Sequence, residues 1–561
     1  MTKKWWMESV GYQIYPKSFY DSNNDGIGDL KGIYEKLPYL KKLGIDLIWI
    51  CPFYDSPMDD NGYDVRNFFE VSKDFGTLED FKMILKRAQE LNIKIILDFV
   101  LNHTSDEHPW FIESRSSIDN NKRDYYIWEQ GKIKDGKEVP PTNWGSFFGG
   151  SAWEKDEITN MYYMKIFSNK MPDLNWSNAE VRNEMIKVGK WWLDLGVDGF
   201  RIDAVSHLDR APFEDSKNGE GIVLDWHKFS NLPRVHEYLK EMNKELFSKY
   251  DVLAIGEVGG EAPIDSALSY SGFDQNELSM VFNFDHNWCN NLHEISNYQD
   301  LKTDVLRLKS VFNKWQTAFS EKGWLPLNWL NHDQPRLMSH YGDLKFFNES
   351  AKMLATALYL MRGTPFIYQG EEIGMTNYPF TNFKEFRDVS SINFYNSLDH
   401  LNEQERIWEV KKTSRDNPRT PIQWNDSKYA GFSNVEPWIN VNPNYKDINV
   451  KSNLENKDSI WHHYKKIIEL RKKSIYKELF IYGEYKQIDL INPNIYIYER
   501  FNENKKVVVI NSFSNETINY NISNYNLKQV LLSNYKDTII KNKIITLRPY
   551  ESLVLEVFNH E

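Results

Sequence analysis

The feature that most constrains the fold is a unit that recurs in the first half of the chain: an amphipathic helix, a Gly or Asn stop, and a short apolar strand. One copy begins at Thr77, which can cap a helix with Asp80 at its third position, and ends in the strand 95–98. Other copies end in the strands 45–50, 197–203 and 252–257. Near-continuous apolar strands separated by helices predict a parallel sheet covered on both faces.

Four further segments bring the number of predicted strands to eight, which favours an α/β fold built on a closed (β/α)8 barrel. They are 11–15, 280–284, 365–369 and a strand leading into 331–333. Acidic residues end several of these strands, namely Asp98, Asp203, Glu257 and Asp333. Such barrels build their active sites at the C-terminal ends of the strands, so four converging carboxyl groups predict a catalytic site there.

The repeat is interrupted twice, and it stops before the end of the chain. Residues 104–172, rich in aromatics and Gly, predict an inserted lobe (domain B) after the third strand, and 375–424 predict a further wall of the pocket. We therefore assign 1–103 and 173–480 to the barrel. Short β-branched runs separated by Asn, Asp and Ser predict a C-terminal all-β sandwich over 481–561.

Composition excludes several classes of function. A net charge of −12 argues against binding to nucleic acid, and no apolar run approaches the roughly 20 residues of a membrane span. The two cysteines, Cys51 and Cys289, are too few for a disulfide framework, and the N-terminal segment shows no signal peptide. We expect buried thiols, a cytoplasmic location, no membrane contact, and a monomer or weak oligomer.

Asp203 and Glu257 could supply the two carboxyl groups that glycoside cleavage requires, one as nucleophile and one as proton donor. Arg201 lies two residues before Asp203, so strand alternation points both side chains to one side, where the guanidinium would keep Asp203 ionised. An ordinary internal Arg–Asp pair explains this spacing equally well.

The segments 98–103, 199–203, 256–258 and 331–333 stand in the order of the four signature segments of the α-amylase superfamily. The chain resembles most closely the α-glucosidase and oligo-1,6-glucosidase branch. This resemblance implies that Asp203 is the nucleophile, Glu257 the acid/base and Asp333 a third carboxylate that grips the sugar. It further implies that His103 and His332 bind sugar hydroxyls.

Release of one terminal glucose requires a blind pocket with polar groups at its floor. Asp64 and Arg419 resemble the family's pair for this role. By the same resemblance, Tyr63 would stack on the sugar ring, and Phe147 and Phe167 would wall the site, although a Phe is more often plain packing.

The segment 21–29 reproduces most of an EF-hand calcium loop, with Gly26 at the sixth position. The predicted ligands are Asp21, Asn23, Asp25, the carbonyl of Ile27, and Asp29. Gly32 stands where such loops carry Glu, and an Asx-rich turn that binds nothing is the alternative. Because relatives in this branch can carry a metal here, we expect a structural Ca²⁺.

The prediction of which glycosidic bond is preferred is based on Ala204, the residue that follows the expected nucleophile Asp203. In the resembling branch this residue tends to be Val in enzymes that prefer α-1,6 bonds and smaller or polar in those that prefer α-1,4. Met171 also departs from the Gln common in oligo-1,6-glucosidases. We therefore expect a retaining, exo-acting α-glucosidase acting on maltose and short α-1,4-linked oligosaccharides.

Three other activities would use the same catalytic residues: those of an oligo-1,6-glucosidase, a trehalose-6-phosphate hydrolase and a sucrose isomerase. A catalytically silent binding or transporter-associated protein of this fold is a separate class. Intact signature segments and the lack of a membrane anchor disfavour it.

Overall fold

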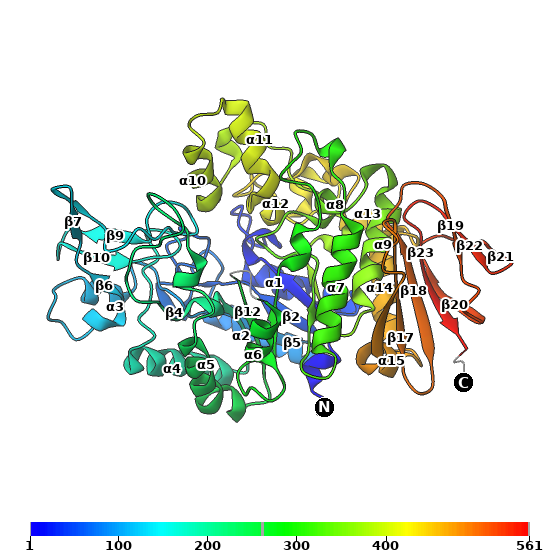
Figure 1. Cartoon of the computed structure of the whole chain (residues 1–561), viewed down its shortest axis with the longest axis horizontal. Helices are drawn as coiled ribbons and strands as arrows, with labels where there is room; N and C mark the ends of the chain where they lie inside the picture. Colours follow the sequence, from blue (N-terminus) through cyan, green and yellow to red (C-terminus); the bar gives the residue numbers. More distant parts are fainter. Residues whose placement is uncertain (1, 260–262, 559–561) are drawn as a thin grey trace.

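Eight short strands pair in parallel into one curved sheet in the computed structural model, which describes residues 2–259 and 263–558 (Figure 1). The strands are β1 (Gly11–Ile14), β2 (Leu47–Ile50), β5 (Lys94–Val100), β11 (Gly199–Asp203), β12 (Leu253–Glu257), β13 (Met280–Phe282), β14 (Pro326–Leu327) and β15 (Thr364–Tyr368). Their order is β13-β12-β11-β5-β2-β1-β15-β14, and β13 and β14 lie in contact where the sheet meets itself. The sheet therefore forms a nearly closed barrel, which confirms the predicted fold class.

Helices that lie between the strands, together with one that follows the last strand, cover the outside of the barrel. They are α1 (Leu30–Leu43), α2 (Leu78–Glu90), α4 (Ala179–Leu195), α5 (Arg234–Glu245), α6 (Ile264–Ser271), α7 (Val305–Phe319), α9 (Phe347–Tyr359) and α14 (Ile460–Lys472). The capping box predicted for α2 is present, because Thr77 accepts from the amide of Asp80 while the Asp80 carboxylate accepts from the amide of Thr77. Phe81, Ile84 and Ala88 form its buried face.

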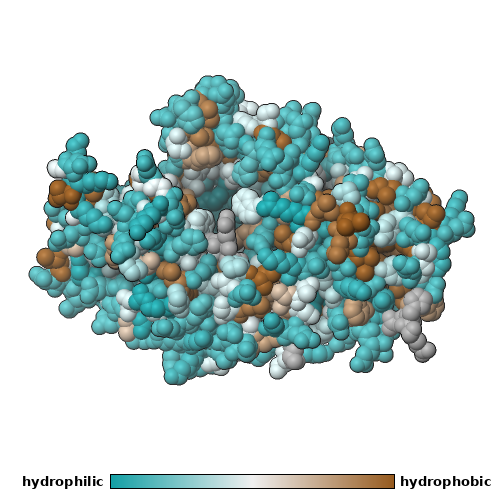
Figure 2. Space-filling view, viewed as in Figure 1, coloured by the Kyte–Doolittle hydropathy of each residue, from teal (hydrophilic) through white to brown (hydrophobic). Residues whose placement is uncertain are grey.

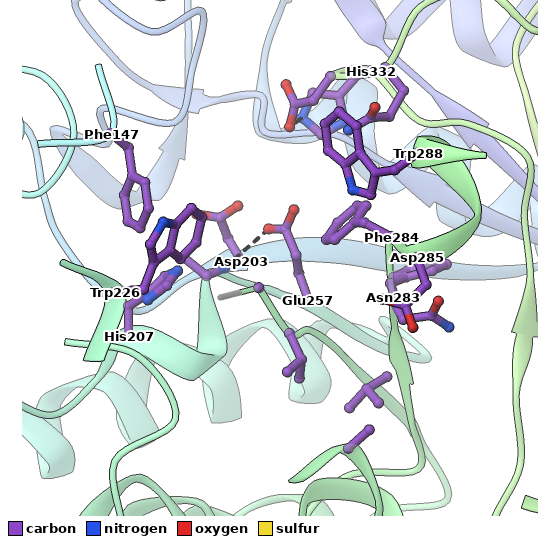
Figure 3. Close-up of a pocket in the computed structure, with 18 of the residues that line it drawn as sticks. Phe147, Asp203, His207, Trp226, Glu257, Asn283, Phe284, Asp285, Trp288 and His332 are labelled. Atoms are coloured by element: carbon purple, nitrogen blue, oxygen red, sulfur yellow. Dashed lines mark hydrogen bonds and ion pairs between the residues drawn. The ribbon is translucent and has the colours of Figure 1, made fainter. Parts of the chain in front are cut away.

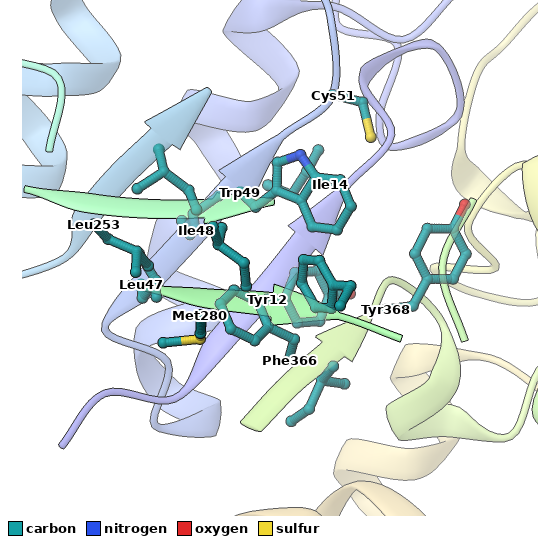
Figure 4. Packing of buried hydrophobic residues seen from close by; sticks show 14 of the residues in the cluster. Tyr12, Ile14, Leu47, Ile48, Trp49, Cys51, Leu253, Met280, Phe366 and Tyr368 are labelled. Atoms are coloured by element: carbon teal, nitrogen blue, oxygen red, sulfur yellow. The ribbon is translucent and has the colours of Figure 1, made fainter. Parts of the chain in front are cut away.

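Apolar side chains of neighbouring strands pack on both faces of the barrel sheet (Figure 4). Inside the barrel, the ring of Trp49 stacks on that of Phe282 with centroids 5.5 Å apart, and Phe366 meets Phe282 edge to face. Tyr12 points to the opposite face, where its hydroxyl donates to Glu372. Both cysteines are buried and free, as expected.

Gly199 allows β11 to approach β12 closely. A Cβ atom on Gly199 would lie 2.0 Å from the carbonyl oxygen of Leu253, and its φ is +145°. A side chain at this position would push the two strands apart. The glycine thus helps to set the spacing of the strands that end in Asp203 and Glu257.

The inserted lobe is a small antiparallel unit at one end of the molecule (Figure 1). It contains α3 (Pro109–Ser114), a three-stranded sheet of β6 (Trp128–Glu129), β10 (Met161–Met164) and β9 (Trp153–Asp156), and the hairpin β7 (Lys132–Lys134) and β8 (Lys137–Val139). A bridge between His103 and Asp173 joins the two chain segments where the lobe leaves the barrel. A second excursion carries α10 (Val389–Ser397), α11 (Glu403–Thr413) and α12 (Asp416–Arg419) above the barrel mouth.

The C-terminal part consists of two packed antiparallel sheets. One contains β16 (Glu484–Ile488), β17 (Ile495–Phe501), β18 (Lys506–Ser512), β23 (Ser552–Val557) and β20 (Leu527–Ser533); the other contains β19 (Ile518–Asn521), β22 (Ile544–Leu547) and β21 (Ile540–Lys541). Ile495 and Ile497 face the interior between the sheets, while Tyr496 and Tyr498 join the barrel core. Residues 559–561, the end of the expected sandwich, lie outside the described residues.

Over residues 2–259 and 263–558, no helix has the length and apolar character needed to cross a membrane.

Candidate active site

Asp203 and Glu257 end adjacent parallel strands. Ile202 pairs with Gly256 in the register of β11 and β12, so the next residue of each strand reaches the same edge of the barrel. Both carboxyl groups line a cavity of about 870 Å³ at this edge. Figure 2 shows the hollow between the inserted lobe and the surface formed by α10 and α11. In Figure 3 the two acids lie between Phe147 and Trp226 on one side and Phe284 and Trp288 on the other.

One buried arginine binds both carboxyl groups. Nη1 of Arg201 lies 2.8 Å from Oδ1 of Asp203, and Nη2 lies 2.6 Å from Oε2 of Glu257. Nη1 also contacts Oδ1 of Asp98 at 2.5 Å. The predicted contact of Arg201 with Asp203 is present, and the same guanidinium also holds Glu257 and Asp98.

Burial shifts the pKa values of the two acids by different amounts. It raises the pKa of Glu257 to about 7, helped by the charges of Asp203 and Asp333 and opposed by Arg201. Burial also raises the pKa of Asp203, to about 6, against the attraction of Arg201. Glu257 therefore keeps its proton to a higher pH than Asp203, which is the order that an acid and a nucleophile require.

Asp333 is held ionised by cations around the same cavity. Its Oδ1 lies 2.7 Å from Nη2 of Arg419 and 3.5 Å from Nη1 of Arg415. Although burial opposes ionisation, the charges of Arg415 and Arg419 hold the pKa of Asp333 well below its usual value. Asp333 is thus a permanent acceptor for hydroxyl groups.

Two neutral histidines line the cavity. Burial lowers the pKa of both His103 and His332 to about 3. Nδ1 of His332 contacts Nε2 of Gln13 at 2.9 Å, whereas Nε2 of His103 is buried without a protein partner. An unpaired buried nitrogen is costly, so His103 is available to a ligand hydroxyl.

The predicted aromatic residues surround the site. Tyr63 stacks on His332 with ring centroids 5.2 Å apart, and its hydroxyl donates to Asp98. The Phe147 and Phe167 rings lie 5.3 Å apart, and Phe147, Phe167 and Tyr63 all line the cavity.

The two residues predicted to hold the terminal glucose, Asp64 and Arg419, are not among those that line the cavity. The Asp64 carboxylate is fully buried and accepts from the amides of Asp59 and Asp60, while Arg419 binds Asp333 and the carbonyl of His332. The ion pair that lines the cavity is formed by Asp60 and Arg415, with Nη2 of Arg415 2.7 Å from Oδ1 of Asp60. Asp64 therefore supports the turn that presents Asp60.

Comparisons with known proteins agree with this geometry. The alpha amylase catalytic domain matches residues 13–483, and the alpha-amylase SusG C-terminal domain matches 495–554. The chain belongs to the alpha-amylase family. It is 47% identical to an oligo-1,6-glucosidase of Bacillus cereus, covering 99% of this chain and 100% of that protein. It is 42% identical to an alpha-glucosidase of Pediococcus pentosaceus, covering 99% of each.

Among solved structures, that of trehalose-6-phosphate hydrolase from Bacillus licheniformis is similar, with a TM-score of 0.91 and 42% identity over 99% of this chain and 100% of that one. This alpha-amylase family member is thus a glycoside hydrolase of the α-glucosidase type.

Sequence reasoning missed several residues of this family member's site. Asp60 lies near Asp64 in the sequence, and Arg415 lies near Arg419. The sequence could have indicated Asp60 and Arg415 only as a second acid and a second arginine in the same two segments. His207, Trp226 and Trp288 also line the cavity, and no sequence pattern marks them.

The loop 21–29 is closed by its own hydrogen bonds. Asp21 accepts from the amides of Asn24 and Gly26, and Asp29 caps α1 by accepting from Gly32. Gly26 has a φ of +92°, the sharp turn that the sixth position of a calcium loop uses. Within the described part of the chain, no group of three or more His, Cys, Asp or Glu is arranged to hold a metal ion. Calcium binding therefore stays a prediction.

Proposed function

We propose that this chain is a retaining, exo-acting α-glucosidase that releases terminal α-1,4-linked glucose from maltose and short oligosaccharides. The observation that carries the proposal is the contact of one guanidinium with both Asp203 and Glu257. Retaining enzymes need their two carboxyl groups about 5 Å apart, and adjacent strands lie about 4.8 Å apart. The contacts of Arg201 with both carboxyl groups, at the ends of neighbouring strands, support this spacing.

The reaction follows from the protonation states. An oxygen of Asp203 attacks the anomeric carbon as the glycosidic bond breaks, and Glu257 gives its proton to the leaving oxygen. Glu257, now ionised, then takes a proton from water as the water oxygen displaces Asp203 from the sugar. His103 and Asp333 supply an unpaired nitrogen and an ionised carboxylate for the sugar hydroxyls.

Ala204 supports the choice of an α-1,4 bond. It lines the cavity directly after Asp203, and its amide lies 3.3 Å from Oε2 of Glu257, so its side chain borders the leaving sugar. A methyl group leaves more room there than a branched side chain. Similarity to an oligo-1,6-glucosidase supports the alternative, hydrolysis of α-1,6 bonds.

The decisive experiment compares initial rates on maltose, isomaltose, sucrose and trehalose 6-phosphate. The anomer of the glucose released from 4-nitrophenyl α-glucoside, which yields a single glucose, is followed by NMR. We expect maltose to be preferred and α-glucose to appear first. Preference for isomaltose would overturn the α-1,4 assignment, and initial release of β-glucose would overturn retention.

We also propose that the loop 21–29 binds one structural Ca²⁺. Asp21, Asn23, Asp25 and the carbonyl of Ile27 would hold it, and Asp29 would support the loop from the start of α1. The ion would supply positive charge that draws these oxygens together.

The two free thiols further support a proposed cytoplasmic location, which cell fractionation would test.

A further inference from the structure

One asparagine bridges the two chain segments that follow the catalytic acids. Asn231 lies in the connection between β11 and β12, just before α5, and is half-buried. Its backbone amide donates to the carbonyl oxygen of Ser206 at 2.8 Å, and its side-chain Nδ2 donates to the carbonyl oxygen of Gly259 at 3.0 Å. Ser206 stands three residues after Asp203, and Gly259 stands two residues after Glu257. The bridge therefore joins the segment of the nucleophile to that of the acid/base.

The side-chain amide of Asn231 has one orientation that satisfies its partners. The Gly259 carbonyl can only accept a hydrogen bond, so the amide nitrogen must face it. The amide oxygen then accepts from the hydroxyl of Tyr270 on α6 at 3.0 Å, and Tyr270 is fully buried. Asn231 also has a φ of +56°, a left-handed conformation that asparagine adopts more readily than most residues.

Gly259 is held at both of its backbone groups. Its amide donates to Oγ of Ser206 at 3.2 Å, while its carbonyl accepts from Asn231. Ser206 is fully buried, so it offers a fixed partner. The chain two residues after Glu257 therefore cannot move away from the segment of the nucleophile without breaking a hydrogen bond.

These two hydrogen bonds continue the support of Glu257 beyond the strands. The ladder between β11 and β12 ends at Ile202 and Gly256, one residue before Glu257. On its other side, Glu257 still pairs with Phe282 of β13. Toward β11, the backbone of Glu257 is bracketed by the last ladder pair and by the hydrogen bonds of Gly259. Proton donation needs a distance of about 2.6–3.2 Å to the leaving oxygen, and a displacement of about 1 Å can cost about 100-fold.

We propose that Asn231 is a positioning residue for proton donation by Glu257. Its side chain fixes Gly259, and through that backbone the carboxyl group of the acid/base is kept where the leaving oxygen can take its proton. Asn231 is not among the residues that line the catalytic cavity, so it acts through Glu257 and not on the sugar. The inference rests on the proposed role of Glu257 and is independent of which glycosidic bond is cleaved.

Removing only the side chain of Asn231 should affect the acid/base and spare the nucleophile. The contact with the Ser206 carbonyl uses the backbone amide, which every variant keeps, and Asp203 is bound separately by Arg201 at 2.8 Å. Asn231→Gly removes the donor and accepts the positive φ without strain. Asn231→Asp keeps the shape of the side chain but places an acceptor against the Gly259 carbonyl.

The test compares kcat/KM for maltose and for 4-nitrophenyl α-glucoside in the parent and in both variants. This parameter reports the steps up to cleavage of the glycosidic bond, and 4-nitrophenolate departs with little need of a proton. We expect kcat/KM for maltose to fall about tenfold, a part of the roughly 100-fold or more that general acid catalysis supplies, while the value for 4-nitrophenyl α-glucoside falls less than about twofold.

Asn276→Gly is the matched control. Asn276 has a φ of +55°, and its Nδ2 donates to the Asp274 carbonyl at 3.4 Å on the surface. This variant loses the same kind of contact in the same backbone conformation, and it should keep both parent values. Ser206→Ala frees the amide of Gly259 instead of its carbonyl and should reproduce the loss for maltose, which covers a failure of either Asn231 variant to fold.

An equal loss for both substrates in variants that melt like the parent would overturn the positioning role, and so would an unchanged value for maltose. Failure of the proposed function looks different. Full turnover by Glu257→Gln would remove the acid/base and with it the positioning role, whereas equal losses in the Asn231 variants would remove the positioning role alone. If the parent prefers isomaltose, the same comparison is made with isomaltose in place of maltose.

Discussion

The backbone amide of Ala204 donates to Oε2 of Glu257 at 3.3 Å, so the residue that follows the nucleophile also touches the acid/base. Ala204 has a φ of +47°, a left-handed conformation that is uncommon outside glycine. The turn that places Asp203 thus also positions Glu257, and a change at Ala204 affects both the geometry and the space beside the leaving sugar.

Replacing Ala204 by Val should reduce kcat/KM for maltose and raise the isomaltose-to-maltose ratio. A β-branched side chain adds bulk beside the leaving sugar and fits the left-handed conformation poorly, at a cost of about 1–3 kcal/mol. Initial rates on both disaccharides and a thermal melt would show the two effects separately. Ala204→Gly is the control, because glycine accepts this φ without bulk and should keep the preference for maltose. An unchanged ratio in Ala204→Val would remove Ala204 from the specificity argument.

The pH dependence of kcat/KM should be a narrow bell. Asp203 must be ionised to attack, so activity falls as pH drops below its pKa of about 6. Glu257 must be protonated to donate, so activity falls as pH rises above its pKa of about 7. Because both groups contact Arg201, the two limbs report the coupled pair. A flat profile from pH 5 to 9 would contradict these assignments.

The alkaline limb should depend on the leaving group. With 4-nitrophenyl α-glucoside the departing phenolate needs little protonation, so loss of the Glu257 proton should slow its release much less. We expect a weaker alkaline limb for this substrate than for maltose. Equal limbs for both substrates would contradict proton donation by Glu257.

Glu257→Gln should lower kcat for maltose by at least about 100-fold, the low end of general acid–base contributions. Maltose binding should remain measurable by calorimetry, because the amide keeps the shape of the side chain. Glu371→Gln is the matched control. Burial raises the pKa of Glu371 to about 8, so its carboxyl group is mostly neutral at pH 7, and it binds Tyr359 and Tyr464 away from the cavity. Full turnover by Glu257→Gln would refute its role.

Calcium should stabilise the folded chain if the loop 21–29 binds it. At a free concentration one hundred times the dissociation constant, the gain is about 2.7 kcal/mol in the free energy of unfolding. Thermal melts with Ca²⁺ and with a chelator measure it. Asp25→Asn should reduce the response, and Asp426→Asn, an exposed partner of Lys451, should not. Identical melts with Ca²⁺ and with chelator would overturn the proposed site.

The barrel strands and their terminal acids could be predicted because their signals are local. Asp203 and Glu257 end apolar strands and Asp98 lies two residues before the end of β5, and parallel pairing must bring such strand ends to one edge of the barrel. The capping box of α2 was predictable for the same reason, since Thr77 and Asp80 lie three positions apart.

Contacts between distant loops could not be predicted in this way. Asp60 and Arg415 are 355 positions apart, and sequence reasoning chose Asp64 and Arg419 from the same two segments. Which acid of a turn faces a cavity depends on how that turn folds: Asp64 points back to the amides of Asp59 and Asp60.

The sequence by itself determined the barrel, the inserted lobe, the C-terminal sandwich and the identity of the carboxyl groups at the strand ends, because helix and strand periodicity act over a few residues. Only the tertiary structure decided that Arg201 holds both Asp203 and Glu257, that Arg415 pairs with Asp60, and that Asn231 reaches Gly259. Those contacts arise where separate segments pack against one another, and their geometry is set by the whole fold.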